Sequence, residues 1–132
     1  AQYEQNQTQD VLAAQLTVVK QLATEFANTQ FETAKLSNLA SRLIIAYEPV
    51  WAIGTGKTPT IQEVQNIHAF INTTLTDIDA SLANTPILYG GSVKADNAAE
   101  IAQCPNVNGV LVGGASLDAT GFTQIIQAFA QI

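Results

Sequence analysis

Glu48 is the residue whose type and place most directly suggest chemistry, because it ends an apolar run and precedes the glycine-containing segment GTGKT. Val50 and Trp51 follow it closely. A carboxylate that such neighbours shield from water is harder to ionise, which makes it a better proton acceptor near neutral pH. We therefore interpret Glu48 as a candidate general base. The alternative is a glutamate that only forms a salt bridge at a strand end.

The letters GTGKT suggest a nucleotide phosphate loop, but their spacing argues against one. That motif reads G-x-x-x-x-G-K-[ST], so with Gly56 as its second glycine the first would stand at position 51. Trp51 occupies that position, and Gly54 is too close to Gly56 to form the wide turn. The motif also runs directly into a helix, whereas Pro59 disfavours a helical backbone at the residue before it. A nucleotide hydrolase is therefore disfavoured.

Two later stretches end in paired glycines. Gly90-Gly91-Ser92 follows the apolar residues 86–89, and Gly113-Gly114-Ala115-Ser116 follows the apolar residues 107–112. Glycines let backbone N–H groups come close to an anion, because no Cβ keeps it away. Either pair alone is more often an ordinary tight turn. Two pairs at the same edge of a sheet predict a site for phosphate or another small anion.

Three short apolar runs would carry these residues. The runs 42–47, 86–89 and 107–112 are too short for helices and are nearly continuously apolar, as in strands covered on both faces. Helical patterns separate them, which predicts parallel strands with helices packed outside, in one domain over residues 1–132. In such folds the site lies at the carboxyl ends of the strands.

Four helices are predicted around these strands. The first spans about residues 8–27 after a frayed, polar start, and the last carries Phe122, Ile125, Ile126 and Phe129 on one face. Thr60 with Glu63, and Asn97 with Glu100, have the spacing of capping boxes that begin the second and third helices.

Composition narrows the class of partner. The net charge of −6 disfavours nucleic acid and anionic membranes, and no apolar run approaches the ~20 residues of a membrane span. The single Cys104 and the lack of an export pattern lead us to expect a cytoplasmic protein. Cys and His are not spaced as metal ligands, so we expect no metal site. We interpret His68 as structural, because a single histidine needs positioned companions to catalyse.

Three motifs identify a resemblance. AYEPVWAIGTGKT at 46–58, YGGSV at 89–93 and GVLVGGASL at 109–117, in this order and spacing, closely resemble the C-terminal part of the triosephosphate isomerase family. The resemblance covers almost the whole chain. It implies an α/β fold that is part of a (β/α)8 TIM barrel, with about three parallel strands and four or more flanking helices. It also implies a cofactor-free isomerase of glycolysis and gluconeogenesis that interconverts dihydroxyacetone phosphate and glyceraldehyde 3-phosphate.

The resemblance also implies a role for each motif residue. Glu48 would be the catalytic base, under a lid formed by residues 49–58. It assigns the substrate phosphate to Gly54, Ser92, Gly113 and Gly114, the lid and its hinges to Pro49, Trp51, Gly56, Lys57, Thr58 and Tyr89, and the pocket wall to Leu111.

Two of the departures from the family pattern bear on catalysis and on the lid. About half of the expected barrel has no counterpart here, including the catalytic lysine and histidine, whose roles none of Lys20, Lys35, Lys94 and His68 can take. Pro59 stands where the family presents an N–H to the hydroxyl of a tyrosine, here Tyr89, and the lost bond would cost the closed lid ~1 kcal/mol.

These departures leave two hypotheses open. The full-length parent would be the isomerase, and a homodimer. The 132-residue chain alone would be an inactive fragment or subunit that only binds phosphate or complements an N-terminal half. Because the chain contains no Met, we expect that it lost an initiator before Ala1 or is a piece of something longer.

Overall fold

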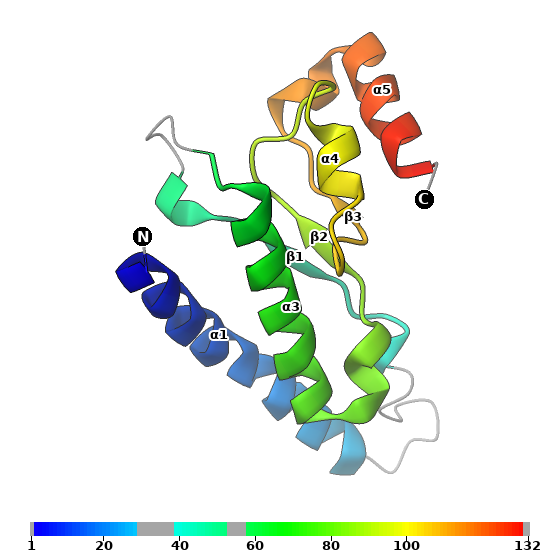
Figure 1. The fold of residues 1–132 in the computed structure, drawn as a ribbon. Helices are drawn as coiled ribbons and strands as arrows, with labels where there is room; N and C mark the ends of the chain where they lie inside the picture. Colours follow the sequence, from blue (N-terminus) through cyan, green and yellow to red (C-terminus); the bar gives the residue numbers. More distant parts are fainter. Residues whose placement is uncertain (1, 29–38, 53–57, 131–132) are drawn as a thin grey trace. The chain divides into compact units, whose positions relative to one another are not determined.

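A computed structural model describes residues 2–28, 39–52 and 58–130. Helices and strands alternate along the chain as predicted (Figure 1). The helices are α1 (Gln2–Asn28), α3 (Ile61–Ile78), α4 (Ala98–Ala102) and α5 (Ala119–Ala130), and the strands are β1 (Ile45–Tyr47), β2 (Ile87–Tyr89) and β3 (Gly109–Val110). The 3-10 helices η2 (Val50–Ala52), η3 (Ala80–Asn84) and η4 (Gly114–Leu117), which periodicity does not predict, lie between them.

The three strands form one parallel sheet in the order β1-β2-β3, which confirms the predicted fold class. Tyr47 pairs with Tyr89, and Tyr89 pairs with Val110. Each strand is shorter than the apolar run that predicted it. The first run is shortened because the N–H groups of Arg42 and Leu43 bond back to the Leu39 carbonyl and close a helical turn. Apolar runs report burial, whereas strand bounds depend on which backbone groups pair.

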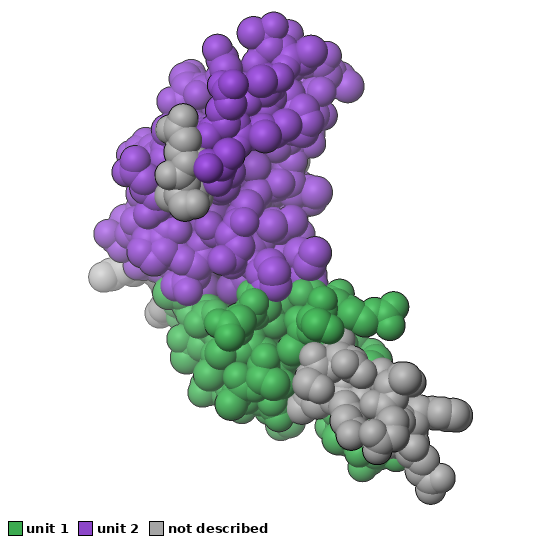
Figure 2. All heavy atoms as spheres, turned by 90° about the vertical axis from the view of Figure 1, so that its right-hand side faces the viewer, with its two compact units in different colours: residues 1–43, 69–85 green, residues 44–68, 86–132 purple. Residues whose placement is uncertain are grey.

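The chain divides into two compact units, residues 1–43 with 69–85 and residues 44–68 with 86–132 (Figure 2). The boundary falls inside α3, between His68 and Ala69. The division does not test the prediction that residues 1–132 form a single domain, and this stays a prediction. None of the helices in the described ranges combines the length and apolarity that crossing a membrane requires.

In the first unit, α1 begins earlier than its apolar pattern predicts. The helix starts at Gln2, so the prediction of a frayed start over residues 1–8 is wrong in the part that the structure describes. Polar residues such as glutamine and glutamate are good helix formers, and they extend a helix without any apolar stripe. Asn72 donates from its side-chain amide to the carbonyl of Ala83 at 2.9 Å, which ties α3 to η3.

In the second unit, the two faces of the sheet differ in burial. Ile45 and Tyr47 of β1 alternate with Ile44, Ala46 and Glu48 on the other face. Tyr47 is buried, whereas Ile44 is 60% exposed. The site residues that follow the strands therefore lie next to a sheet face that the described residues leave largely open.

One of the two predicted capping boxes is confirmed. The Thr60–Glu63 capping box is present, because Glu63 Oε2 accepts from the Thr60 N–H at 2.7 Å and Thr60 Oγ1 accepts from the Glu63 N–H at 3.2 Å. Of the residues predicted to share one face of the last helix, Ile125 is buried and Ile126 is exposed. Asn97 precedes α4 without a side-chain cap bond, because its amide bonds to the preceding loop instead.

Candidate active site

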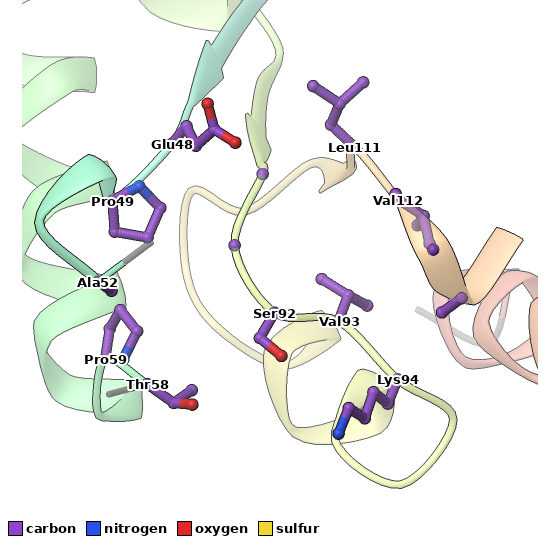
Figure 3. A pocket seen from close by; sticks show the side chains of 15 residues that line it. Glu48, Pro49, Ala52, Thr58, Pro59, Ser92, Val93, Lys94, Leu111 and Val112 are labelled. Carbon is purple, nitrogen blue, oxygen red and sulfur yellow. The ribbon is translucent and has the colours of Figure 1, made fainter. Parts of the chain in front are cut away.

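A cavity of about 730 Å³ lies where the three strands end, within the second unit (Figure 3). Its walls come from the residues that follow each strand, and from both ends of the segment predicted as a lid. The lining residues are Glu48, Pro49 and Ala52 after β1, Thr58 and Pro59 before α3, Gly90 to Lys94 after β2, and Leu111 to Ala115 after β3. The structure thus brings together Glu48, Pro49, Thr58, Ser92, Leu111, Gly113 and Gly114, all named from the sequence.

The Glu48 side chain points into this cavity because it lies on the face of the sheet opposite to the Tyr47 side chain. Successive side chains of a strand point to opposite faces, so the Tyr47 ring is buried under the sheet while the Glu48 side chain projects into the cavity. Figure 3 shows its carboxylate extending toward the side on which Leu111 lies. The backbone N–H of Gly90 donates to the Tyr47 carbonyl at 2.8 Å and holds the ends of β1 and β2 together.

The shielding of Glu48 that its sequence neighbours predicted is not found. The Glu48 side chain is exposed, and so is Val50, whereas Trp51 is half-buried. Neighbours in sequence do not surround a side chain when the chain turns away between them, as it does here into η2. A dry environment for this carboxylate would have to come from outside the described residues.

The turn after β2 is tightly built. A Cβ on Gly91 would collide with the hydroxyl of Tyr89, so this position has room only for glycine. The Asn97 side chain also holds this turn, since its Nδ2 donates to the Ser92 carbonyl at 2.9 Å and its Oδ1 accepts from the Lys94 N–H at 2.8 Å. The Tyr89 ring and the Asn97 side chain together restrict the path of the backbone through Ser92.

The turn after β3 is open by comparison. A Cβ on Gly113 or on Gly114 would meet no atom within 4 Å. The carbonyl of Gly113 accepts from the Ser116 N–H at 2.9 Å and from the Ser116 hydroxyl at 2.7 Å, which forms η4. Main-chain N–H groups next to such open space can be approached by an anion, and the anion site itself stays a prediction.

A buried aromatic cluster lies behind the cavity, and it was only partly predicted. The His68 imidazole contacts Tyr47 edge-on, with ring centroids 6.0 Å apart, and lies 6.2 Å from the Tyr89 ring. Burial lowers the pKa of His68, and the bond of its ring to the Asn106 carbonyl opposes this effect. His68 follows Val64 and precedes Ile71 on the buried face of α3, and this spacing could have revealed that it is buried.

The two tyrosines of the cluster stay neutral. Burial raises the pKa of Tyr89 to about 12, with a smaller contribution from the nearby Tyr47. Burial also raises the pKa of Tyr47, while the Trp51 indole, which donates a hydrogen bond to the Tyr47 hydroxyl, lowers it. Neither phenol therefore carries charge near neutral pH, and both act through packing and hydrogen bonding.

Some of the predicted site residues cannot be placed. Gly54, Gly56 and Lys57 lie outside the described residues. Pro59 lines the cavity, and Tyr89 lies beneath Gly91, but the structure does not test their roles in a lid. In the ranges that the structure describes, no three His, Cys, Asp or Glu side chains are grouped to hold a metal.

The sequence of this chain matches one family of known proteins. The family model described as "Triosephosphate isomerase" matches residues 1–129. A protein of Psychrobacter arcticus named "Triosephosphate isomerase" is 50% identical over 131 residues, which are 99% of this chain and 46% of that protein. One of Acinetobacter baumannii (strain ATCC 17978) with the same name is 58% identical over 91 residues, 69% of this chain and 34% of that protein.

A solved structure agrees with these relatives. The crystal structure of triosephosphate isomerase from Bartonella henselae superposes with a TM-score of 0.59 at 41% identity, covering 69% of this chain and 36% of that one. This likeness confirms the predicted fold class, part of a TIM barrel. The chain spans about half the length of the curated relatives that match 99% of it. It belongs to the triosephosphate isomerase family.

Proposed function

We propose that this chain forms the base-bearing half of a triose-phosphate isomerase, which interconverts dihydroxyacetone phosphate and glyceraldehyde 3-phosphate. One observation carries the proposal: Glu48 and both glycine turns line the same cavity. A base and an anion site within one cavity suit a small substrate that has a phosphate at one end and a carbonyl at the other.

Glu48 is the general base in this proposal. Its carboxylate takes a proton from the carbon beside the carbonyl, and an enediolate forms as the carbonyl oxygen gains negative charge. The same carboxyl then returns a proton to the former carbonyl carbon, while a proton passes from the hydroxyl oxygen to the former carbonyl oxygen through a group outside the described residues. Ketose and aldose are thereby exchanged without net oxidation or reduction. The backbone N–H groups of Ser92, Gly113 and Gly114 seat the phosphate, and Leu111 walls the pocket.

The lid would shield Glu48 from water. Glu48 is exposed in the described structure, so water would be excluded from its carboxylate when the segment 49–58 closes over the substrate. Pro49 and Thr58 line the cavity at the two ends of this segment. Trp51 would be its bulky lever and Gly54 its contact with the phosphate. Gly56 and Lys57 would form the rest of the hinge.

The remaining catalytic groups would come from outside these residues. The family resemblance supplies a lysine and a histidine from strands that have no counterpart here, so we propose that the complete enzyme, a cytoplasmic homodimer without a cofactor, provides them. A second candidate is that the chain alone is inactive and binds phosphate or complements an N-terminal half. The sheet face that bears Ile44, 60% exposed, and Leu111, 57% exposed, favours such a partner.

Isomerase assays on two forms of the protein test the proposal. One form is the 132-residue chain, and the other is a chimera in which the chain replaces the matching region of the Psychrobacter arcticus protein. We expect turnover from the chimera and essentially none from the chain alone. Glu48→Gln should lower kcat of the chimera by about 10²–10⁴-fold. The control Glu25→Gln, on exposed α1, should have no effect.

Three results would contradict parts of this account. A folded chimera without isomerase activity would remove the isomerase assignment. A Glu48→Gln chimera with the turnover of the Glu25→Gln control would remove Glu48 as the base. Near-normal turnover from the 132-residue chain alone would show that no group outside it is needed.

A further inference from the structure

His68 is enclosed where no substrate reaches it. Its side chain is 0% exposed, and the rings that it contacts are nearly as buried, with Tyr47 5% and Tyr89 1% exposed. The imidazole therefore packs against two phenol rings, one from the end of β1 and one from the end of β2. A change in the size of the side chain at position 68 must allow at least one ring to move, because buried side chains pack at close to crystal density.

Both rings are joined directly to the walls of the cavity. Tyr47 is followed by Glu48, and Tyr89 is followed by Gly90 and Gly91. The Tyr89 hydroxyl fills the space that a Gly91 Cβ would need, so the ring and the turn are in contact. The backbone bond between Gly90 and Tyr47 fixes the strand ends, so a shift of the Tyr89 ring would instead displace Gly91 and the residues that lead to Ser92.

His68 itself is held from the opposite side. Its Nδ1 lies 3.0 Å from the Asn106 carbonyl, so Nδ1 carries the proton and donates it. Asn106 has a φ of 64°, the left-handed conformation, and belongs to the turn that leads into β3. The Nε2 atom has no hydrogen-bond partner in the described part of the chain. One ring nitrogen anchors the imidazole, and the rest of the ring acts by packing.

We propose that His68 is a positioning residue, whose ring holds the Tyr89 ring against Gly91 and so fixes the turn Gly90-Gly91-Ser92 relative to Glu48. The inference rests on the proposed function, because the position of the turn matters only if the carboxylate and the turn act on one substrate. It does not require His68 to touch the substrate or to transfer a proton.

Two substitutions separate the ring from its hydrogen bond. His68→Asn keeps a donor for the Asn106 carbonyl but removes the ring, whereas His68→Phe keeps a ring and removes the donor. In the chimera, His68→Asn should lower kcat/KM by up to about 100-fold. His68→Phe should keep most of kcat/KM, although it lowers the unfolding temperature. The control Ile125→Val, buried on α5, should lower the unfolding temperature without changing kcat/KM.

Activity measured well below each unfolding temperature decides between positioning and mere stability. Low kcat/KM in His68→Asn together with near-parental kcat/KM in His68→Phe supports the proposal. Parental kcat/KM in folded His68→Asn overturns it. An equal loss in both variants also overturns it, because the ring would then not be the group that matters.

The unfolding temperatures of the parent, the two single variants Gly91→Ala and His68→Asn, and the double variant test whether His68 holds Tyr89, even if the chimera is inactive. Gly91→Ala pushes its Cβ into the Tyr89 ring, and the ring can retreat only where the imidazole is absent. Gly91→Ala should therefore lower the unfolding temperature less in the His68→Asn background than in the parent. Equal losses in both backgrounds would show that His68 does not fix Tyr89. Loss of activity in the unmodified chimera would instead contradict the proposed function, so the two failures are distinguishable.

Discussion

The two glycine turns of the cavity look alike in sequence but differ in their surroundings. Gly91, after β2, is enclosed by the Tyr89 ring, and the Asn97 side chain clamps the residues that follow it. Gly114, after β3, has open space where a Cβ would stand. The first turn needs glycine because the Tyr89 side chain fills the place where a Cβ would stand. The second turn has no such neighbour and is open to a ligand. The Gly-Gly pair therefore allows close packing in the turn after β2 and leaves room for a ligand in the turn after β3.

The strongest test of this contrast is Gly91→Ala. The added methyl group would meet the Tyr89 hydroxyl, and overpacking a filled site should lower the free energy of unfolding by ~1–3 kcal/mol. Denaturant unfolding of the chimera measures this. A Gly91→Ala protein as stable as the parent would show that the turn after β2 is not enclosed as described.

Asn97→Ala should have the next largest effect. The substitution removes both bonds that the side chain makes to Ser92 and Lys94 and leaves backbone groups without these partners, at a cost of ~1–2 kcal/mol. Ser116→Ala is the matched change in the second turn, where it removes one side-chain bond instead of two. Equal losses in the two variants would contradict the difference between the turns.

Gly114→Ala should leave the fold intact and weaken ligand binding. Nothing contacts the added methyl group, so the free energy of unfolding should change by no more than ~0.5 kcal/mol. The methyl group would lie next to the N–H groups that are proposed to seat phosphate, and affinity should fall on the order of 10-fold. Calorimetric titration with inorganic phosphate measures this, and unchanged affinity would place the anion elsewhere.

Acid should weaken the second unit through His68, which packs against Tyr89 beside the first turn. Burial lowers the pKa of His68 below its ordinary value of 6.5, so the unfolded chain takes up this proton at a higher pH than the folded chain. The contribution to stability is complete above about pH 6.5 and is lost as the pH falls through the folded pKa. Tyr47 and Tyr89, whose pKa values are raised, stay neutral throughout.

Unfolding temperatures between pH 7.5 and pH 5 check this expectation. The His68→Phe chimera is the control, because it cannot take up the proton, and its stability should depend less on pH over this range. A pH dependence that is the same in the parent and in His68→Phe would show that other groups are responsible.

Local sequence predicts where the site residues lie better than it predicts what surrounds them. Glu48 and the glycines could be placed at the ends of strands because apolar runs and breakers are local signals. The cluster of Tyr47, His68 and Tyr89 could not, since it depends on which elements pack together. The cap bond expected of Asn97 failed for the same reason: its residue type and spacing suit a helix cap, but the Lys94 N–H occupies the Oδ1 atom that would accept from the helix.

The exposure of Glu48 shows a further limit of local sequence. Its apolar neighbours were expected to shield it, yet the carboxylate is exposed next to a sheet face on which Ile44 and Leu111 are exposed as well. Shielding of that face depends on groups that lie far away in sequence or outside these residues. The apolar sequence around Glu48 is thus typical of a buried site, although the described residues do not cover this carboxylate.

Conversion of triose phosphate by the Glu48→Gln chimera in deuterium oxide tests the central claim most directly, with inorganic phosphate affinity measured on the same protein. If Glu48 is the base beside an independent anion site, turnover and deuterium incorporation into the product should be nearly abolished while phosphate affinity stays within about 3-fold of the parent, a difference of less than 1 kcal/mol. Parental turnover with deuterium incorporation in Glu48→Gln would contradict the claim that this carboxylate moves the proton.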